Sequence, residues 1–264
     1  MLFHTRHFLK PPKNDDMKKQ FIITYTSLSI GWLLLMIAIF SIILSSCTKE
    51  NINGSGHVIS QTRNISALTD VEVSGDFEVH LKQAAVTALE IKAEDNIIGV
   101  VETGVHANTL YVRIRERTRL HNHLPIKVYI QSPIFQRLQF DGSGTADNED
   151  TIHTSLFKYE INGSGKGWLT LATTDLNTTI NGSGDMVLKG RASTHNSEIN
   201  GSGTVSGTDM EVQKANITIS GSGEHAIFVR RQLDVRINGS GEVHYKGEAN
   251  VVSNIKGSGK VTKQ

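Results

Sequence analysis

The triplet Gly-Ser-Gly recurs through the second half of the chain at a nearly constant interval. The copies stand at 142–144, 163–165, 182–184, 201–203, 221–223, 239–241 and 257–259, with an earlier copy at 54–56. From Gly142 onward the successive steps are 21, 19, 19, 20, 18 and 18 residues. Such regularity is typical of repeat proteins, in which similar units stack along one axis.

The residues around each triplet predict strands. Isoleucine and asparagine precede four of the triplets, at Ile161-Asn162, Ile180-Asn181, Ile199-Asn200 and Ile237-Asn238. Upstream, apolar residues alternate with polar ones, as at Leu233, Val235 and Ile237. A period of two indicates a strand with one buried face. Each repeat therefore reads as a strand, a Gly-Ser-Gly corner, a second strand and a return turn.

The length of the repeat selects one architecture. A propeller blade needs about 40 residues, and the consensus patterns of leucine-rich and calcium-binding nonapeptide repeats are absent from the sequence. A coil of about 19 residues fits a parallel β-helix, in which each strand pairs with its equivalent about 4.8 Å away. Glycine tolerates the backbone of a sharp corner, and stacked asparagines can form hydrogen-bonded ladders. We therefore predict an all-β chain that folds as a right-handed parallel β-helix-like solenoid with Gly-Ser-Gly corners.

The chain divides into four segments by pattern. Residues 1–46 form a leader, 47–56 an anchor linker, 57–140 an irregular half made of β coils, and 141–264 the regular half of the same body. All four prolines, at 11, 12, 125 and 133, precede the regular half. Proline removes a ladder hydrogen bond, so its absence from the repeats agrees with stacked strands. In the irregular half, residues 95–98 are expected to form a short helix or turn.

The leader ends at the single cysteine of the chain. Lys18 and Lys19 precede an apolar run from about Phe21 to Ile43, which is the layout of a signal peptide. Leu44-Ser45-Ser46-Cys47 then resembles the lipobox of bacterial lipoproteins, which implies lipid attachment at Cys47. A single cysteine excludes an intrachain disulfide or a cysteine-cluster metal site. The alternative is an uncleaved anchor, because the run is long enough to span a bilayer.

A lipid on Cys47 would make the membrane a partner of the chain. We expect a cell-envelope protein on the outer membrane, with its periplasmic or surface orientation open and with either Met1 or Met17 as the start. Without residues 1–46 the chain carries 22 basic and 24 acidic residues. This balance argues against a nucleic-acid partner. Nothing in the sequence calls for a cofactor or a metal.

Four arginines alternate at 113, 115, 117 and 119. On one strand, Arg113, Arg115, Arg117 and Arg119 would share a face and form an anion-binding stripe for acidic glycan or lipopolysaccharide phosphate. The alternative is a solvated strand face that is partly neutralised by Glu116 and by neighbouring strands.

Other candidate residues are weaker. His121 and His123 form a pair without a third metal ligand, and a loop before Pro125 explains them equally well. Acidic residues at Asp141, Asp147, Glu149 and Asp150 either form a turn or supply carboxylates to a carbohydrate-active enzyme. Trp168 and Tyr245 would be packing residues or a platform for stacking sugars.

The order of motifs resembles one protein family. An early Gly-Ser-Gly is followed by Thr62-Arg63-Asn64-Ile65, by Val71-Glu72-Val73-Ser74-Gly75-Asp76-Phe77-Glu78-Val79, by Leu89-Glu90-Ile91, and by Phe140-Asp141-Gly142-Ser143-Gly144. This pattern, over about residues 52–262, is similar to the family called "putative auto-transporter adhesin, head GIN domain", common in Bacteroidetes-type bacteria. The resemblance implies a β-helix-like fold without known catalytic residues. We expect a non-catalytic adhesion or scaffold module for a glycan or protein ligand, with an enzyme or a periplasmic structural module as alternatives.

Overall fold

The computed structural model describes residues 49–264, so the leader and Cys47 lie outside the described residues. Residues Glu50–Gln264 form one compact unit, built almost entirely of strands. Within the described part of the chain, no helix is both long and apolar enough to cross a membrane.

The described elements follow in chain order. They are β1 (Glu50–Asn53), β2 (Val58–Arg63), β3 (Asp70–Ser74), β4 (Glu78–Gln83), β5 (Ala88–Glu94), the 3-10 helix η1 (Ile98–Val100), β6 (Val101–His106), β7 (Thr109–Ile114), β8 (Thr118–His121), β9 (Lys127–Ser132) and β10 (Arg137–Gly142). The remainder are β11 (Thr145–Asn148), β12 (Ile152–Gly163), β13 (Lys166–Gly182), β14 (Asp185–Gly201), β15 (Thr204–Gly221), β16 (Glu224–Gly239), β17 (Glu242–Lys246), β18 (Asn250–Gly257) and β19 (Lys260–Lys263).

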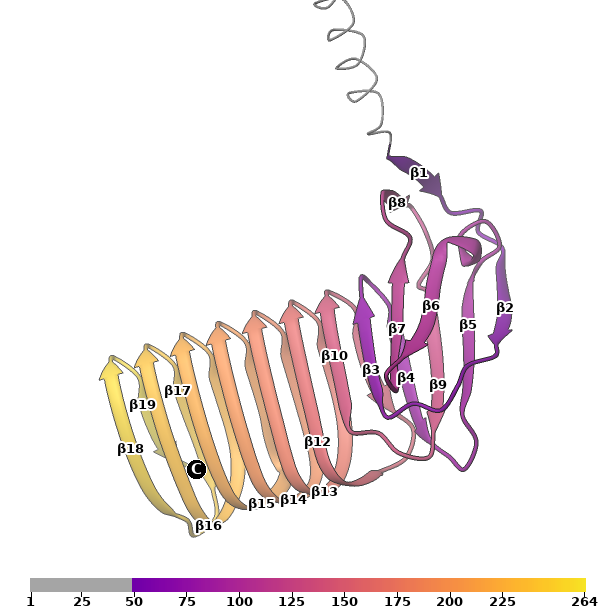
Figure 1. Cartoon of the computed structure of the whole chain (residues 1–264). Helices are drawn as coiled ribbons and strands as arrows, with labels where there is room; N and C mark the ends of the chain where they lie inside the picture. The colour runs from indigo at the N-terminus through magenta and orange to yellow at the C-terminus, as the bar shows by residue number, and fades with distance from the viewer. Residues whose placement is uncertain (1–48) are drawn as a thin grey trace, which may run out of the picture. The chain divides into compact units, whose positions relative to one another are not determined.

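The strands of the regular half stack in parallel, each on its equivalent from the previous coil (Figure 1). The register places one triplet on the next, so that Gly163 pairs with Gly182, and Gly182 with Gly201. The same pairing continues through Gly221 and Gly239. The prediction of a parallel β-solenoid with coils of about 19 residues is confirmed.

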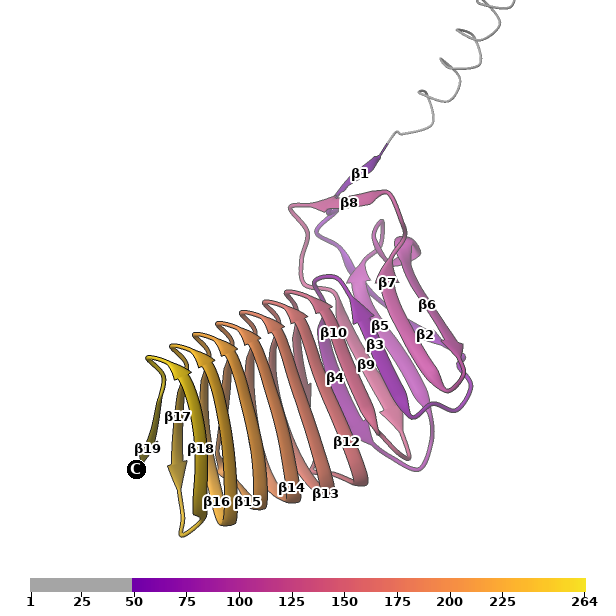
Figure 2. The same cartoon turned by 60° about the vertical axis from the view of Figure 1, so that its left-hand side comes forward.

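Each long strand runs around most of a coil. In β13, residues 166–171 lie on what we call the second face, residues 172–175 make the return corner, and residues 176–181 lie on the first face and lead to the next triplet. Figure 2 shows these strands side by side along the body. The Gly-Ser-Gly corner and the return corner therefore lie at opposite edges of the coil. The pairing register shifts after Val187 of β14 and after Gly207 of β15. These shifts accommodate an extra residue in β15.

Alternating side chains from both faces fill the core. The isoleucines that precede the triplets stack inward from Ile161 to Ile237, and Ile161, Ile180 and Ile199 have no exposed surface. The third glycine of each triplet makes room for them, since a Cβ on Gly184 would lie 2.7 Å from Cγ2 of Ile161. The first glycine has a positive φ, for example +134° at Gly201, where an L side chain is strained.

The irregular half both extends and covers the stack. Strands β3 and β4 pair in parallel with β10 and β11, whereas β2, β5 and β6 join through antiparallel pairs. η1 follows a turn at residues 95–97, which agrees with the expected short helix or turn. The early triplet at 54–56 does not stack on the other Gly-Ser-Gly corners. It contacts the end of β5 instead, where the Gly56 N–H donates to the Glu94 carboxylate at 2.6 Å.

Candidate binding site

A groove runs along the return corner across several coils. Its volume is about 790 Å³, and its residues come from β12 to β15. Hydroxyl side chains of Thr154, Thr173 and Ser193 line it, and Leu171 and Ala192 supply apolar surface. This mixture of hydroxyl groups and small apolar patches suits a polar, polyhydroxylated ligand.

Local backbone chemistry places a cation in this groove. Gly190 has a φ of +108°, and a Cβ there would overlap the Leu171 carbonyl oxygen on the preceding coil. Arg191 is the next residue along the chain after Gly190. Its exposed side chain has no ion pair or side-chain hydrogen bond to any described residue. The guanidinium therefore remains available to a ligand oxygen.

A fixed ion pair lies at the rim of the same groove. Arg230 donates from Nε and from the terminal nitrogen Nη2 to the Glu211 carboxylate, at 2.7 and 3.1 Å. The hydrogen bond from Arg230 lowers the pKa of Glu211, so the carboxylate stays ionised and accepts hydrogen bonds. The groove thus presents acceptors as well as donors.

A second groove, of about 650 Å³, lies on the first face near its start. Tyr111 and Arg113 line it from β7, opposite Glu102 of β6. Arg113 donates to Glu102 at 3.0 Å, and Arg63 donates to the carbonyl oxygens of Ile98 and Val101. Both guanidinium groups therefore already have protein partners.

The structure separates the four alternating arginines. Strand β7 ends at Ile114, so only Arg113 lies on the first face. Arg115 and Arg117 lie in the following turn, where Arg117 has a φ of +63°, and Arg119 lies on β8. The expectation that one strand carries all four arginines is wrong, because the chain turns after Ile114. Anion binding by these residues remains a prediction.

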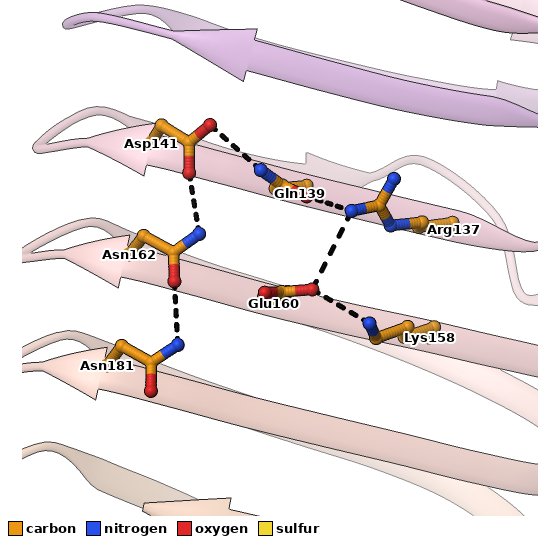
Figure 3. A network of polar contacts seen from close by, with 7 residues as sticks. All are labelled: Arg137, Gln139, Asp141, Lys158, Glu160, Asn162 and Asn181. Atoms are coloured by element: carbon orange, nitrogen blue, oxygen red, sulfur yellow. Dashed lines mark hydrogen bonds and ion pairs between the residues drawn. The ribbon is translucent and has the colours of Figure 1, made fainter. Parts of the chain in front are cut away.

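A ladder of polar side chains crosses the first face (Figure 3). Asn200 donates to Asn181, Asn181 to Asn162, and Asn162 to the carboxylate of Asp141, over 3.0, 2.8 and 2.6 Å. Each amide donates to the preceding coil. The last acceptor of the ladder is therefore the Asp141 carboxylate, which accepts hydrogen bonds without having to donate one. Glu160 lies beside it and is paired with Lys158 at 3.0 Å and Arg137 at 3.7 Å. This ladder is the stacked-asparagine arrangement expected from the repeats.

The acidic residues near the first triplet have separate partners. Asp141 ends the ladder, Asp147 accepts a hydrogen bond from Nδ1 of His80 at 2.8 Å, and Glu149 pairs with Lys82. The His80 ring is stacked on Tyr129, with ring centroids 4.7 Å apart. Trp168 pairs with Asp147 across neighbouring strands and is 46% exposed, whereas Tyr245 is partly buried against the core.

The histidine pair lies where β8 ends: His121 is the last residue of the strand, and His123 lies in the loop that follows. Nε2 of His121 contacts the Asn51 side chain at 3.2 Å, and Nδ1 of His123 contacts the Leu124 carbonyl at 2.8 Å. Within residues 49–264, no three His, Cys, Asp or Glu side chains come together as a group that could hold a metal ion.

Sequence reasoning missed the groove at the return corner. The residues of this corner carry no repeated triplet, and Arg191 lacks an equivalent at a fixed repeat position. The one local signal is Gly190, which is exposed and breaks the strand alternation just before Arg191. An isolated glycine within a strand pattern often marks a close backbone approach.

Comparison with known proteins identifies the family. The chain belongs to the family described as "Putative auto-transporter adhesin, head GIN domain", whose model matches residues 67–249. The resemblance inferred from the motifs is therefore confirmed. A comparison with curated proteins finds no match.

Solved structures share the fold. A putative adhesin from Bacteroides fragilis is 23% identical, with a TM-score of 0.78 over 81% of this chain and 100% of that chain. A putative lipid binding protein from Parabacteroides distasonis is 22% identical, with a TM-score of 0.69 over the same shares. A putative adhesin from Parabacteroides merdae is 18% identical, with a TM-score of 0.66 over 81% of this chain and 99% of that chain.

Proposed function

We propose that this chain is a lipid-anchored protein of the outer membrane whose solenoid is a non-catalytic adhesion module for a glycan. The observation that carries the proposal is the groove at the return corner, where Arg191 lies among the hydroxyl groups of Thr154, Thr173 and Ser193. Hydroxyl groups and charged side chains match the many hydroxyl groups of a saccharide, and Leu171 and Ala192 match its apolar C–H surface. Membership of the adhesin family supports the same role.

The rigidity of the site favours binding. The groove is built on paired strands of successive coils, and Thr173 on β13 pairs directly with Ala192 on β14. A ligand that spans several coils would meet groups about 4.8 Å apart, held by the sheet itself. Little ordering of the protein is then needed on binding, which improves affinity.

Glycan binding is tested with the purified protein on immobilised bacterial and host polysaccharides, followed by titration of oligosaccharides from any that bind. Arg191→Ala is expected to weaken binding at least tenfold, since it removes a charged hydrogen-bond donor. Arg236→Ala is the matched control, because Arg236 is an exposed arginine on the first face. Equal affinities of the wild type and Arg191→Ala would contradict the proposed site. Cleavage of the bound oligosaccharide would instead favour the enzymatic alternative.

The anchor is proposed from the sequence around Cys47. Two or three acyl chains hold a protein firmly on a membrane, whereas one chain binds only marginally. In cells, the full chain is expected in the membrane fraction, and Cys47→Ser is expected to release it after cleavage or to leave an unprocessed precursor. Intact-mass measurement of the mature protein reports the acyl chains directly. A mature protein without added acyl mass would contradict lipid attachment.

A further inference from the structure

The start of the compact unit is a fixed strand. β1 pairs in parallel with β8, with Glu50 opposite Thr118 and Asn53 opposite His121. The Glu50 N–H donates to the Arg117 carbonyl at 2.9 Å, and the Gly54 N–H donates to the His121 carbonyl at 3.1 Å. Both figures show β1 and β8 beyond the ends of β3 and β7 (Figures 1 and 2). We call β1, β8 and the turn at residues 115–117 the anchor end.

The anchor end lies close to Cys47 by covalent connection alone. Three peptide units join Cys47 to Glu50, and a chain of that length reaches at most about 11 Å. A lipid on Cys47 would therefore hold the anchor end within about one Debye length of the lipid headgroups at 0.1 M salt. Side chains at that distance interact with the charge of the membrane.

The anchor end carries an excess of basic residues. Arg115, Arg117 and Arg119 all have exposed side chains, and Lys49 directly precedes β1. The acidic residues of this end are Glu50, which accepts from Arg115 at 2.6 Å, and Glu116. Within the anchor end itself, three arginines therefore stand against two carboxylates, which leaves a net positive charge. Leu124, which is 44% exposed, adds an apolar side chain just beyond β8.

We propose that the anchor end is a second membrane contact, which binds the phosphate headgroups of an anionic lipid surface through Arg115, Arg117 and Arg119. The inference rests on the proposed lipid attachment at Cys47, which brings this end to the membrane. Each Lys or Arg near an anionic surface adds attraction, and one lipid signal combined with a basic patch gives stable attachment. This contact explains why three of the four alternating arginines lie away from the first-face groove.

The contact has a consequence for the glycan groove. Strand β7 ends toward the anchor end on the side of the Gly-Ser-Gly corners, since Arg113 pairs with Ser74 just before Gly75. The return corner lies at the other edge of the coil, and Thr173 precedes Gly182 by nine positions, or about 30 Å of strand. With the anchor end on lipid, the groove faces away from the membrane, where a ligand on another surface can reach it.

The test uses a chain that begins at Thr48, so that binding does not depend on the lipid. Its described core lies within Glu50–Gln264, which forms a compact unit by itself. Vesicles of phosphatidylcholine with about 30 mol% of the anionic lipid phosphatidylglycerol, which gives them a negative surface potential, are sedimented with the protein and compared with pure phosphatidylcholine vesicles. We expect binding to the anionic vesicles only, with at least a tenfold loss of affinity in about 0.5 M salt.

Charge-reversal variants test whether this surface in particular, and not the net charge of the protein, binds the vesicles. The double variant Arg117→Glu with Arg119→Glu is expected to bind anionic vesicles at least tenfold more weakly. The control, Lys256→Glu with Lys260→Glu, makes the same change in net charge on β18 and β19 and is expected to bind as the wild type does. Equal binding to neutral vesicles, no binding at low salt, or equal losses in both double variants would overturn the proposal. Failure of this test leaves the acyl-mass result intact, so the two proposals fail separately.

Discussion

Gly201 stacks on Gly182 of the preceding coil so closely that a Cβ on Gly201 would overlap the Gly182 carbonyl oxygen. The same oxygen accepts the Ser202 N–H at 3.0 Å. The contact recurs from coil to coil, for example between Gly221 and the Gly201 carbonyl. Glycine is therefore required at the first position of the triplet for two reasons. Its φ is positive, and the carbonyl oxygen of the preceding coil leaves no room for a Cβ.

Gly201→Ala should destabilise the solenoid strongly. The alanine would adopt a strained backbone and would push against a carbonyl oxygen that cannot move without breaking the ladder, at a cost of about 3 kcal/mol. For a unit of this size the melting temperature should fall by about 6–12 °C. Gly99→Ala is the control, because its Cβ would meet no atom within 4 Å. Equal melting temperatures of the two variants would refute the stacked-corner account.

Asn181→Ala removes the centre of the polar ladder. It deletes the bond donated to Asn162 and the bond accepted from Asn200, and exposed hydrogen bonds contribute about 1 kcal/mol. We expect the free energy of unfolding in urea to fall by about 1 kcal/mol more than in Thr179→Ala, a change at the neighbouring outward position of the same strand. A smaller loss in Asn181→Ala than in Thr179→Ala would show that the ladder does not stabilise the stack.

Tyr159→Phe should stabilise the protein. The Tyr159 hydroxyl is fully buried and has no hydrogen-bond partner among the described residues, and burial raises the pKa of this phenol. Removing an unsatisfied buried hydroxyl should gain about 1 kcal/mol, because its desolvation is no longer uncompensated. Thermal unfolding measures the gain, and a lower melting temperature would reveal a partner for the hydroxyl outside the described contacts.

Two buried histidines predict that the protein weakens in acid. His195 and His225 lie inside the solenoid with ring centroids 5.5 Å apart. Burial lowers the pKa of His195 to about 4, and burial together with the charge of His195 lowers the pKa of His225 well below 6.5. Between about pH 6.5 and 4 the unfolded chain binds protons that the native state excludes. The free energy of unfolding therefore falls as the pH falls through this range.

The histidine contribution is measured by urea unfolding at pH 7.5 and pH 4.5. For His195 alone, the free energy of unfolding is expected to fall by about 3 kcal/mol as the pH falls through the full range from the unfolded to the native pKa. The double variant His195→Leu with His225→Leu should lose less stability on acidification than the wild type. His106→Leu, at an exposed histidine without an ion pair to any described residue, is the control for the loss of a histidine side chain. An identical acid response in the wild type and the double variant would refute this explanation.

The repeat predicts the regular half because the same physical constraint acts on every coil. Each first glycine has a positive φ, and the isoleucines before the triplets from Ile161 to Ile237 fill the core, so register and coil length follow from the spacing of the triplets. The irregular half lacks this redundancy. The antiparallel pairs of β2 with β5 and of β6 with β7 leave no periodic trace, and the alternation of arginines continues through the turn after Ile114.

The groove at the return corner depends on tertiary geometry. Thr154, Thr173 and Ser193 come from three different coils and occupy a corner whose sequence varies from one repeat to the next. The buried pair of His195 and His225 is equally hidden, because neither residue takes a fixed place in the repeat. In the strand pairing His195 lies beside Ala215 and His225 beside Val205, so the two rings come from opposite faces of the coil and meet only inside the stack.

The most direct test of the account is the labelling of intact cells with an antibody against residues 49–264, compared with permeabilised cells. An adhesion module needs its groove outside the cell, so intact cells should stain as strongly as permeabilised ones. Staining that requires permeabilisation would place the body in the periplasm and would contradict adhesion as its function.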